Sequence, residues 1–237
     1  MKRYLCFIGI ISLAFNLCSC NSIDNYTLTG RCEEWKMPED GIVYLSVLDL
    51  RNDDMENMLK RTRVEKDGTF KFSGYVKEPQ IVYVCSINHS SPYNGFTFHG
   101  MCILEDGDIE MDCEIFERNR SFIDCVGRGT PTNDRIRNFY SAQDSIIREC
   151  MANGDEMVYS SYPEVEKHQI EYINRNKNDF SSVFLAIDAL RSGSSIEDIP
   201  DEIVNNKFVK AYIETCPKTE DTFSSIIEEE IIPIHVD

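Results

Sequence analysis

The sequence has few basic residues for its acidity. Its 237 residues include 24 lysines and arginines against 41 aspartates and glutamates, which gives a formal net charge of -17. An acidic surface repels a phosphate backbone, and the basic residues are scattered rather than clustered. We therefore expect no nucleic-acid partner.

The sequence also lacks the common motifs of metal sites and enzymes. Its four histidines form no H-E-x-x-H pattern, and there is no C-x-x-C, no phosphate-binding glycine loop and no G-x-S-x-G. His168 has Glu164 and Glu171 nearby on a predicted helix, which a solvated helix face explains. We therefore predict no catalytic residue, no metal and no cofactor, and a protein that is not an enzyme.

Two weaker patterns could carry binding, and each has a plainer explanation. Asp106 and Asp108 flank a glycine and faintly resemble part of a calcium loop, but a β-turn accounts for them because the remaining ligands are missing. Tyr93, Phe96 and Phe98 could form an exposed aromatic rim for a glycan or a peptide. Such rings more often belong to the core of a strand.

The first twenty residues have the pattern of an export signal. The basic pair Lys2-Arg3 precedes an apolar run from Leu5 to Leu17, which is too short to span a bilayer comfortably. The run ends in Leu17-Cys18-Ser19-Cys20, which resembles a bacterial lipobox. An ordinary signal peptide with incidental cysteines is the alternative.

This pattern predicts a lipid-anchored protein of the bacterial cell envelope. We expect a lipoprotein signal peptide over residues 1–19, with cleavage before Cys20 and diacylglycerol on its sulfur. Residues 20–25 would be the tether, and the acyl chains would hold the protein on a membrane. We expect the outer membrane, on its periplasmic or surface side.

Seven of the ten cysteines lie outside the predicted export segment. Because seven is odd, at least one of them cannot pair within the chain. Buried thiols, structural disulfides and a reactive thiol all remain open for this group. Cys113 shares a predicted strand face with Ile109 and Met111 and is expected to be a small core residue. The seven are Cys32, Cys85, Cys102, Cys113, Cys125, Cys150 and Cys216.

Residues 26–129 have the pattern of an antiparallel β-sandwich or barrel with roughly eight strands. Its central stretch, 64–76, predicts a strand, a turn and a strand, with Phe70 and Phe72 on one face. The preceding residues, 51–60, favour a turn or a short helix. The continuous apolar run 80–87 predicts a strand that is covered on both faces.

Residues 130–216 predict a small helical domain, which makes the fold class α+β. Thr132 or Asn133 can cap the first helix, and apolar residues recur at helical spacing after it. Further helices are expected after Pro163, over 181–191, and as one helix after Pro200. The tail, 217–237, carries no clear pattern.

Four segments of the chain resemble a known bacterial family, domain-of-unknown-function family 4369. They are D-G-T-F-K-F-S-G at 67–74, K-E-P at 77–79, I-L-E-D-G-D-I at 103–109 and V-G-R-G-T-P-T-N-D at 126–134. Their order behind the lipobox carries the resemblance, which covers about residues 26 to 195. The family is common in Bacteroidetes envelope lipoproteins. There its β domain often precedes a thioredoxin-like domain with a redox C-x-x-C, which is absent here, so the resemblance transfers no oxidoreductase activity.

Three hypotheses for function follow. The first is a non-catalytic binding or scaffold module of the envelope. The second is an accessory to thiol-disulfide exchange that works with a separate thioredoxin-fold protein, as the family resemblance implies. The third is a glycan-binding β-sandwich, which requires the aromatic residues between Tyr93 and Phe98 to be exposed.

Overall fold

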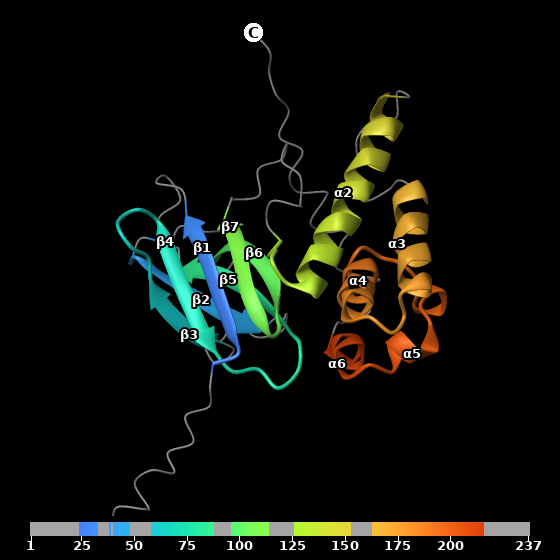
Figure 1. The fold of residues 1–237 in the computed structure, drawn as a ribbon. Helices are drawn as coiled ribbons and strands as arrows, with labels where there is room; N and C mark the ends of the chain where they lie inside the picture. Colours follow the sequence, from blue (N-terminus) through green and yellow to red (C-terminus); the bar gives the residue numbers. More distant parts are fainter. Residues whose placement is uncertain are drawn as a thin grey trace, which may run out of the picture.

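The N-terminal part of the chain forms two β-sheets that pack face to face, and helices follow them (Figure 1). The computed structural model describes residues 24–32, 38, 40–47, 58–87, 96–113, 126–152 and 163–215. The smaller sheet has the order β4-β1-β7 and the larger one β3-β2-β5-β6. The strands are β1 (Tyr26–Cys32), β2 (Ile42–Val47), β3 (Met58–Arg63), β4 (Thr69–Gly74), β5 (Gln80–Ile87), β6 (Phe96–Leu104) and β7 (Gly107–Cys113).

The smaller sheet is mixed, whereas the sequence predicts antiparallel pairing. β1 pairs antiparallel with β4 and parallel with β7, so that Thr29 lies opposite Lys71 on one side and opposite Glu110 on the other. The described strands belong to two separate sheets, which favours the sandwich over the barrel.

An apolar core fills the space between the two sheets. Leu28, Leu45 and Val82 are fully buried in it. Phe70 and Phe72 lie in the same core with ring centroids 5.8 Å apart, which confirms that β4 turns both rings to one face. Phe70 also covers its cross-strand partner Gly30, where an added Cβ would come within 2.2 Å of the ring.

The stretch 64–76 contains the predicted turn, but it does not form a hairpin of paired strands. β3 before the turn pairs with β2 of the larger sheet, and β4 after it pairs with β1 of the smaller one. The turn is closed by a hydrogen bond from the Glu65 amide to the Thr69 carbonyl at 2.7 Å. β3 begins at Met58, so the end of segment 51–60 is a strand rather than a turn or a short helix. Local alternation shows that both segments are strands, but it does not specify their partners.

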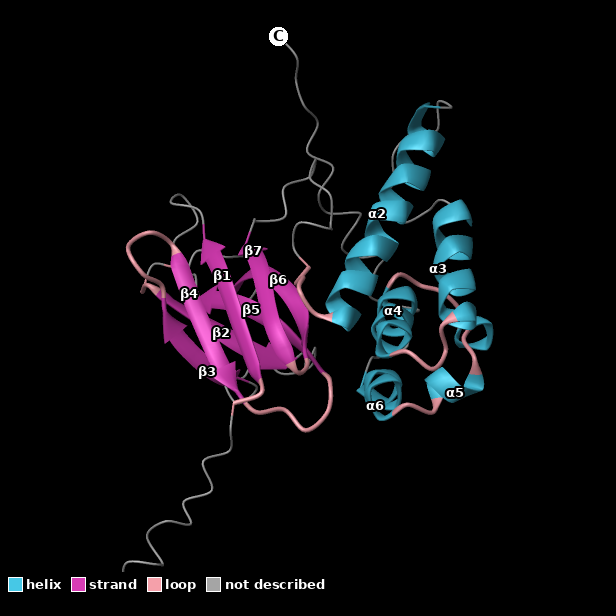
Figure 2. Cartoon of the chain, in the orientation of Figure 1, coloured by secondary structure: helices cyan, strands magenta, loops and turns pink. Residues whose placement is uncertain are grey.

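The helical part contains five α-helices and a short 3-10 helix within the described residues (Figure 2). These are α2 (Pro131–Ala152), α3 (Pro163–Arg175), α4 (Phe180–Arg191), η4 (Ile196–Asp198), α5 (Asp201–Val204) and α6 (Lys207–Thr215). In this described part of the chain, no helix is both long enough and apolar enough to cross a bilayer.

Two details of the predicted helices are wrong. α2 already begins at Pro131, so Thr132 and Asn133 lie inside its first turn instead of capping it. Proline is well suited to the first helical position because the amide there has no helical partner. The single helix expected after Pro200 is divided into α5 and α6, since the Asn206 side chain accepts a hydrogen bond from the Phe208 amide and starts a new helix.

The helices pack against the outer face of β5 and β6 (Figure 1). Ile81 and Ile103 point away from the sandwich and share a buried cluster with Phe139 and Leu185 of α2 and α4. Val82, the neighbour of Ile81, points into the sandwich core. β5 is therefore buried on both faces, as its continuous apolar sequence predicts.

Asn133 joins the start of α2 to the edge of β6. Its side chain is fully buried, and its Oδ1 accepts a hydrogen bond from the Ile103 amide at 2.8 Å. Its Nδ2 donates to the Ile103 carbonyl at 2.8 Å and to Thr130 Oγ1 at 2.7 Å. The side chain thus pairs with the edge of β6 as another strand would, which protects this edge and fixes the helix on the sheet.

Candidate functional site

The outer face of the smaller sheet is polar and faces away from the helices (Figure 1). Because side chains alternate along a strand, β1 presents Thr29 and Arg31 on this face, β4 presents Thr69 and Lys71, and β7 presents Glu110. Arg31, Lys71 and Glu110 are exposed, and the two threonines are half-buried. The face is therefore accessible to a ligand.

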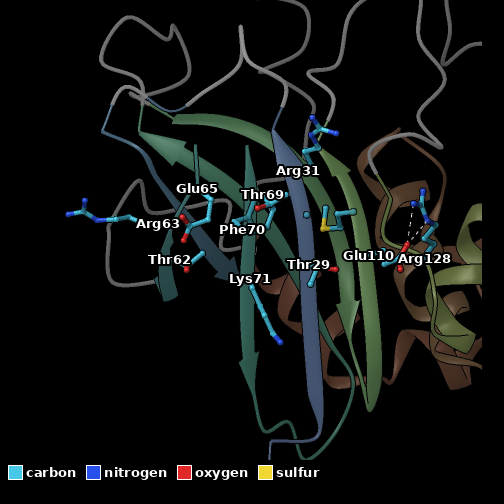
Figure 3. Close-up of a pocket in the computed structure, with 12 residues that line it drawn as sticks. Thr29, Arg31, Thr62, Arg63, Glu65, Thr69, Phe70, Lys71, Glu110 and Arg128 are labelled. Atoms are coloured by element: carbon cyan, nitrogen blue, oxygen red, sulfur yellow. Dashed lines mark hydrogen bonds and ion pairs between the residues drawn. The ribbon is translucent and has the colours of Figure 1, made fainter. Parts of the chain in front are cut away.

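An open pocket of about 450 Å³ lies at this face and at the neighbouring end of β3. Figure 3 shows Thr29 and Lys71 on adjacent strands, with Arg128 and Glu110 on the β7 side and Arg31 towards the end of β1. Its lining residues come from β1, β3, the turn after β3, β4, β7 and the segment before α2: Thr29, Gly30, Arg31, Thr62, Arg63, Glu65, Thr69, Phe70, Lys71, Glu110, Met111 and Arg128.

The charge of this pocket differs from that of the chain as a whole. Its lining contains four basic side chains and two carboxylates, in a protein with a formal net charge of -17. Arg128 forms an ion pair with Glu110 at 3.2 Å. Among the described residues, Arg31 and Lys71 form no ion pair, so both cations are available to a ligand.

The turn between β3 and β4 fixes one side of the pocket. Asp67 Oδ1 accepts hydrogen bonds from the Thr69 hydroxyl at 2.7 Å and from the Thr69 amide at 3.1 Å. These bonds, with a smaller contribution from nearby Arg31, hold the pKa of the Asp67 carboxyl below its usual range. The carboxylate is thus held by the turn, which keeps Thr69 in a defined position beside Arg31.

A buried serine–histidine pair lies on the larger sheet and does not line this pocket. His99 Nε2 in β6 and Ser86 Oγ near the end of β5 are 2.7 Å apart. A histidine next to a serine hydroxyl can activate a nucleophile, but both side chains are at most 2% exposed. We assign this pair to the core, because a substrate cannot reach it in this conformation.

A half-buried polar group joins three helices, and a neighbouring contact joins them to β5. The Asp188 carboxylate accepts hydrogen bonds from the Tyr140 hydroxyl at 3.0 Å and from Gln169 Nε2 at 3.3 Å. Burial raises the pKa of Asp188, although the bond from Tyr140 acts in the opposite direction. One turn further along α4, Arg191 donates to the Tyr83 hydroxyl at 3.4 Å. The bonds to Asp188 join α4 to α2 and α3, and the bond from Arg191 joins α4 to the sheet.

Several residues singled out in the sequence lie outside the description. Cys20 and Tyr93 belong to segments that are not described, and for Phe96, Phe98 and Cys113 only the backbone is described. The lipid anchor, the aromatic rim and the environment of the Cys113 side chain therefore stay predictions.

The cysteine side chains that the structure describes are all buried: Cys32, Cys85, Cys102 and Cys150. Burial raises the pKa of Cys85 to about 12 and raises that of Cys102 further. Since the thiolate is the reactive form, neither of these two residues is suited to thiol-disulfide exchange in the folded protein.

The structure also describes the surroundings of the other candidates, which are Asp106, Asp108 and His168. Asp106 and Asp108 are exposed on either side of Gly107, and no group of three or more potential metal ligands occurs among the described residues. His168 is half-buried and stacks on Phe139, with ring centroids 4.9 Å apart, so its prediction as part of a solvated helix face is wrong. Burial also lowers the pKa of His168.

The residues around the pocket are not predicted as a site from the sequence. Thr29-x-Arg31 on β1 and Thr69-x-Lys71 on β4 repeat the same pattern of a threonine followed two positions later by a cation. Because alternate residues share a strand face, this repeat is a signal for a common surface. It only becomes informative once β1 and β4 are known to be neighbours.

The fold and the exposed face define a class, a two-sheet β domain with helices packed on the larger sheet and a polar surface on the smaller one. Residues 26–136 match the family described as "Domain of unknown function (DUF4369)", so the chain carries a domain of this family. The match extends into α2, which agrees with the attachment of Asn133 to β6. No curated protein and no solved structure matches the chain.

Proposed function

We propose that this protein is a lipid-anchored, non-catalytic binding module of the bacterial cell envelope that uses the outer face of the smaller sheet. The observation that carries the proposal is the open pocket on that face, where charged side chains and threonine hydroxyls surround about 450 Å³. Such groups bind by charge and hydrogen bonding. The anchoring part rests on the lipobox-like sequence that ends at Cys20 and on the family resemblance.

The alternatives have less support. The high pKa values of Cys85 and Cys102 count against these two as partners in thiol-disulfide exchange. A glycan-binding sandwich with an aromatic rim depends on side chains that are not described. The polar pocket offers a different binding surface, on another sheet.

The anchor is tested by the variant Cys20→Ala, with Cys18→Ala as the matched control two residues earlier. Acyl chains bind a membrane by burying their methylene groups, so we expect the first variant to move from the membrane fraction to the soluble fraction. The control should stay with the membrane and carry lipid on Cys20, as shown by mass spectrometry of the mature N-terminus. A wild-type protein without lipid on Cys20 would contradict the anchor.

The binding face is tested by photocross-linking in the native envelope. A photoreactive residue replaces Lys71 at the pocket, and in the control it replaces Lys210, which is exposed on α6. We expect a discrete cross-linked product at position 71 that is absent at position 210 and disappears in Arg31→Gln. Identical products at both positions would show that this face has no special role.

A further inference from the structure

The pocket on the smaller sheet combines unpaired cations with hydroxyl groups, and this combination indicates the chemistry of its ligand. Arg31 and Lys71 extend from adjacent strands, at diagonal positions of the same face. In the register of the two strands, Thr69 lies opposite Arg31 and Thr29 lies opposite Lys71. Arginine forms bidentate hydrogen bonds with carboxylates and phosphates, and lysine adds a compact positive charge.

The cations surround the pocket and do not meet at one point. Figure 3 shows Arg31 and Lys71 directed to different sides of the β1–β4 surface, while Arg128 lies on the β7 side. A single small anion could contact only one of them at close range. A ligand with two or more separated anionic groups could use several at once, which increases its affinity over that of a single group.

The charge of the whole protein limits the size of this ligand. With a formal net charge of -17, the surface as a whole repels a long polyanion. Only the short-range field of the pocket is favourable, because charges beyond about 10 Å are screened at moderate ionic strength. The pocket therefore suits a compact ligand better than an anionic polymer.

We propose that this pocket binds a small ligand that carries two or more oxyanionic groups, with Arg31 and Lys71 as its main contacts. This inference rests on the proposed function and names the class of ligand for the same face. Arg128 contributes less, because it is engaged with Glu110. The threonine hydroxyls beside the cations add neutral hydrogen bonds to the same oxygens.

Isothermal titration calorimetry of the purified mature protein at about 0.1 M ionic strength, where the net charge of the protein is screened, tests this directly. The probes are pyrophosphate and citrate, with inorganic phosphate and acetate as matched ligands of lower charge. We expect saturable binding of at least one multivalent probe, and weaker binding of its smaller counterpart. Preference for pyrophosphate would identify phosphate groups as the ligand chemistry, and preference for citrate would identify carboxylates. No saturable binding of either multivalent probe would overturn the proposal.

Two double variants distinguish the effect of the pocket cations on binding from the effect of the protein's net charge. Arg31→Gln with Lys71→Gln removes the two pocket cations, and Arg148→Gln with Lys210→Gln removes the same charge from exposed sites on the helices. We expect the pocket pair to weaken binding at least about tenfold, since each charge-assisted hydrogen bond contributes a factor of this order. The control pair should bind as the wild type does. Equal losses in both pairs would overturn the site.

A third variant predicts a change in the opposite direction. Glu110→Gln removes one of the two carboxylates that line the pocket, and with it a negative charge that repels an anionic ligand. We expect binding to tighten by about twofold to fivefold, which is the range for a single interaction between exposed charges. The control, Glu171→Gln, breaks an exposed pair with Arg175 on α3 and should leave binding unchanged. Weaker binding in Glu110→Gln would contradict the assignment.

The two proposals can fail separately. If photocross-linking at position 71 succeeds while pyrophosphate and citrate both fail to bind, the face is a binding surface for a ligand of another chemistry. If the multivalent probes bind but position 71 yields no specific product in the envelope, the pocket is an oxyanion site and the binding module must use another surface.

Discussion

The outer faces of the two sheets have opposite characters, although both sheets share one core on their inner side. On the larger sheet, Ile81 and Ile103 are covered by helices. On the smaller sheet, Arg31, Lys71 and Glu110 are exposed. One outer face is thus used to build the fold, and the other is available for contacts with a partner.

The sequences of β5, in the larger sheet, and β4, in the smaller sheet, reflect this difference between the outer faces. β5 reads Q-I-V-Y-V-C-S-I, a nearly continuous apolar run, because both of its faces are buried. β4 reads T-F-K-F-S-G, with apolar and polar residues in alternation, because only one face is buried. The comparison shows that the sequence of a strand predicts whether its outer face is buried or exposed, provided that the position of the strand is known.

The largest effect is expected from a truncation on the covered face. Ile103→Ala should destabilise the protein by about 3 kcal/mol, since it leaves a cavity between β6 and the helices. Lys71→Ala, its counterpart on the open face, should change the free energy of unfolding by no more than about 0.5 kcal/mol. Urea unfolding measures both. Similar decreases in the free energy of unfolding for the two variants would show that the two outer faces do not differ in their contribution to stability.

A smaller effect is expected at the junction that attaches the helices. Asn133→Ala leaves the Ile103 amide and carbonyl without their buried partner, which should cost about 2 kcal/mol. Asn205→Ala removes an exposed side-chain bond to the Asp201 carbonyl and should cost less than about 0.5 kcal/mol. A loss at position 133 no greater than this control would mean that the helices are held by apolar contacts alone.

The pH dependence of stability tests the half-buried carboxylate of Asp188 on the covered side. The pKa of Asp188 is raised in the folded state, so its protonated form is favoured there. Its contribution is fully present below the unfolded-state pKa of about 3.9 and is lost as the pH rises through the folded-state value. Relative to Asp188→Asn, the wild type should therefore lose stability from about pH 4 upward, with a slope of at most about 1.4 kcal/mol per pH unit for one proton.

Urea unfolding of both proteins at several pH values measures this difference. Asp198→Asn, at an exposed position after α4, controls for the loss of one carboxylate. Parallel curves for the wild type and Asp188→Asn would show that the carboxyl has the same affinity for protons in both states.

Much of the fold can be predicted from periodicity, but the pairing of the strands cannot. The alternation around Phe70 and Phe72 identifies β4, and the apolar run of β5 identifies a doubly covered strand. The turn at Asp67–Gly68 suggests a hairpin, yet β3 and β4 enter different sheets, so the turn alone does not specify which strands pair. The parallel pairing of β1 with β7 involves residues too distant in sequence for any local signal.

The candidate site depends entirely on this pairing. Arg31 and Lys71 are ordinary scattered cations in the sequence and become neighbours only through the β1–β4 register. The sequence predicts Asn133 as a possible helix cap, since its side chain can accept a hydrogen bond from an amide. It does accept one, but from a strand of another part of the chain. The chemistry of single residues is therefore predictable, whereas their partners follow from the tertiary fold.

The central position of β1 also determines the order in which the chain can fold. In the larger sheet, β2 and β3, like β5 and β6, are consecutive along the chain and can pair early in folding. β1 must wait for β4 on one side and for β7 on the other, and such long-range pairings close slowly. We therefore expect the first strand of the domain, directly after the expected lipid tether, to be among the last to form its pairings. Until then both of its edges are open to other chains, so folding of the smaller sheet is the step most exposed to aggregation.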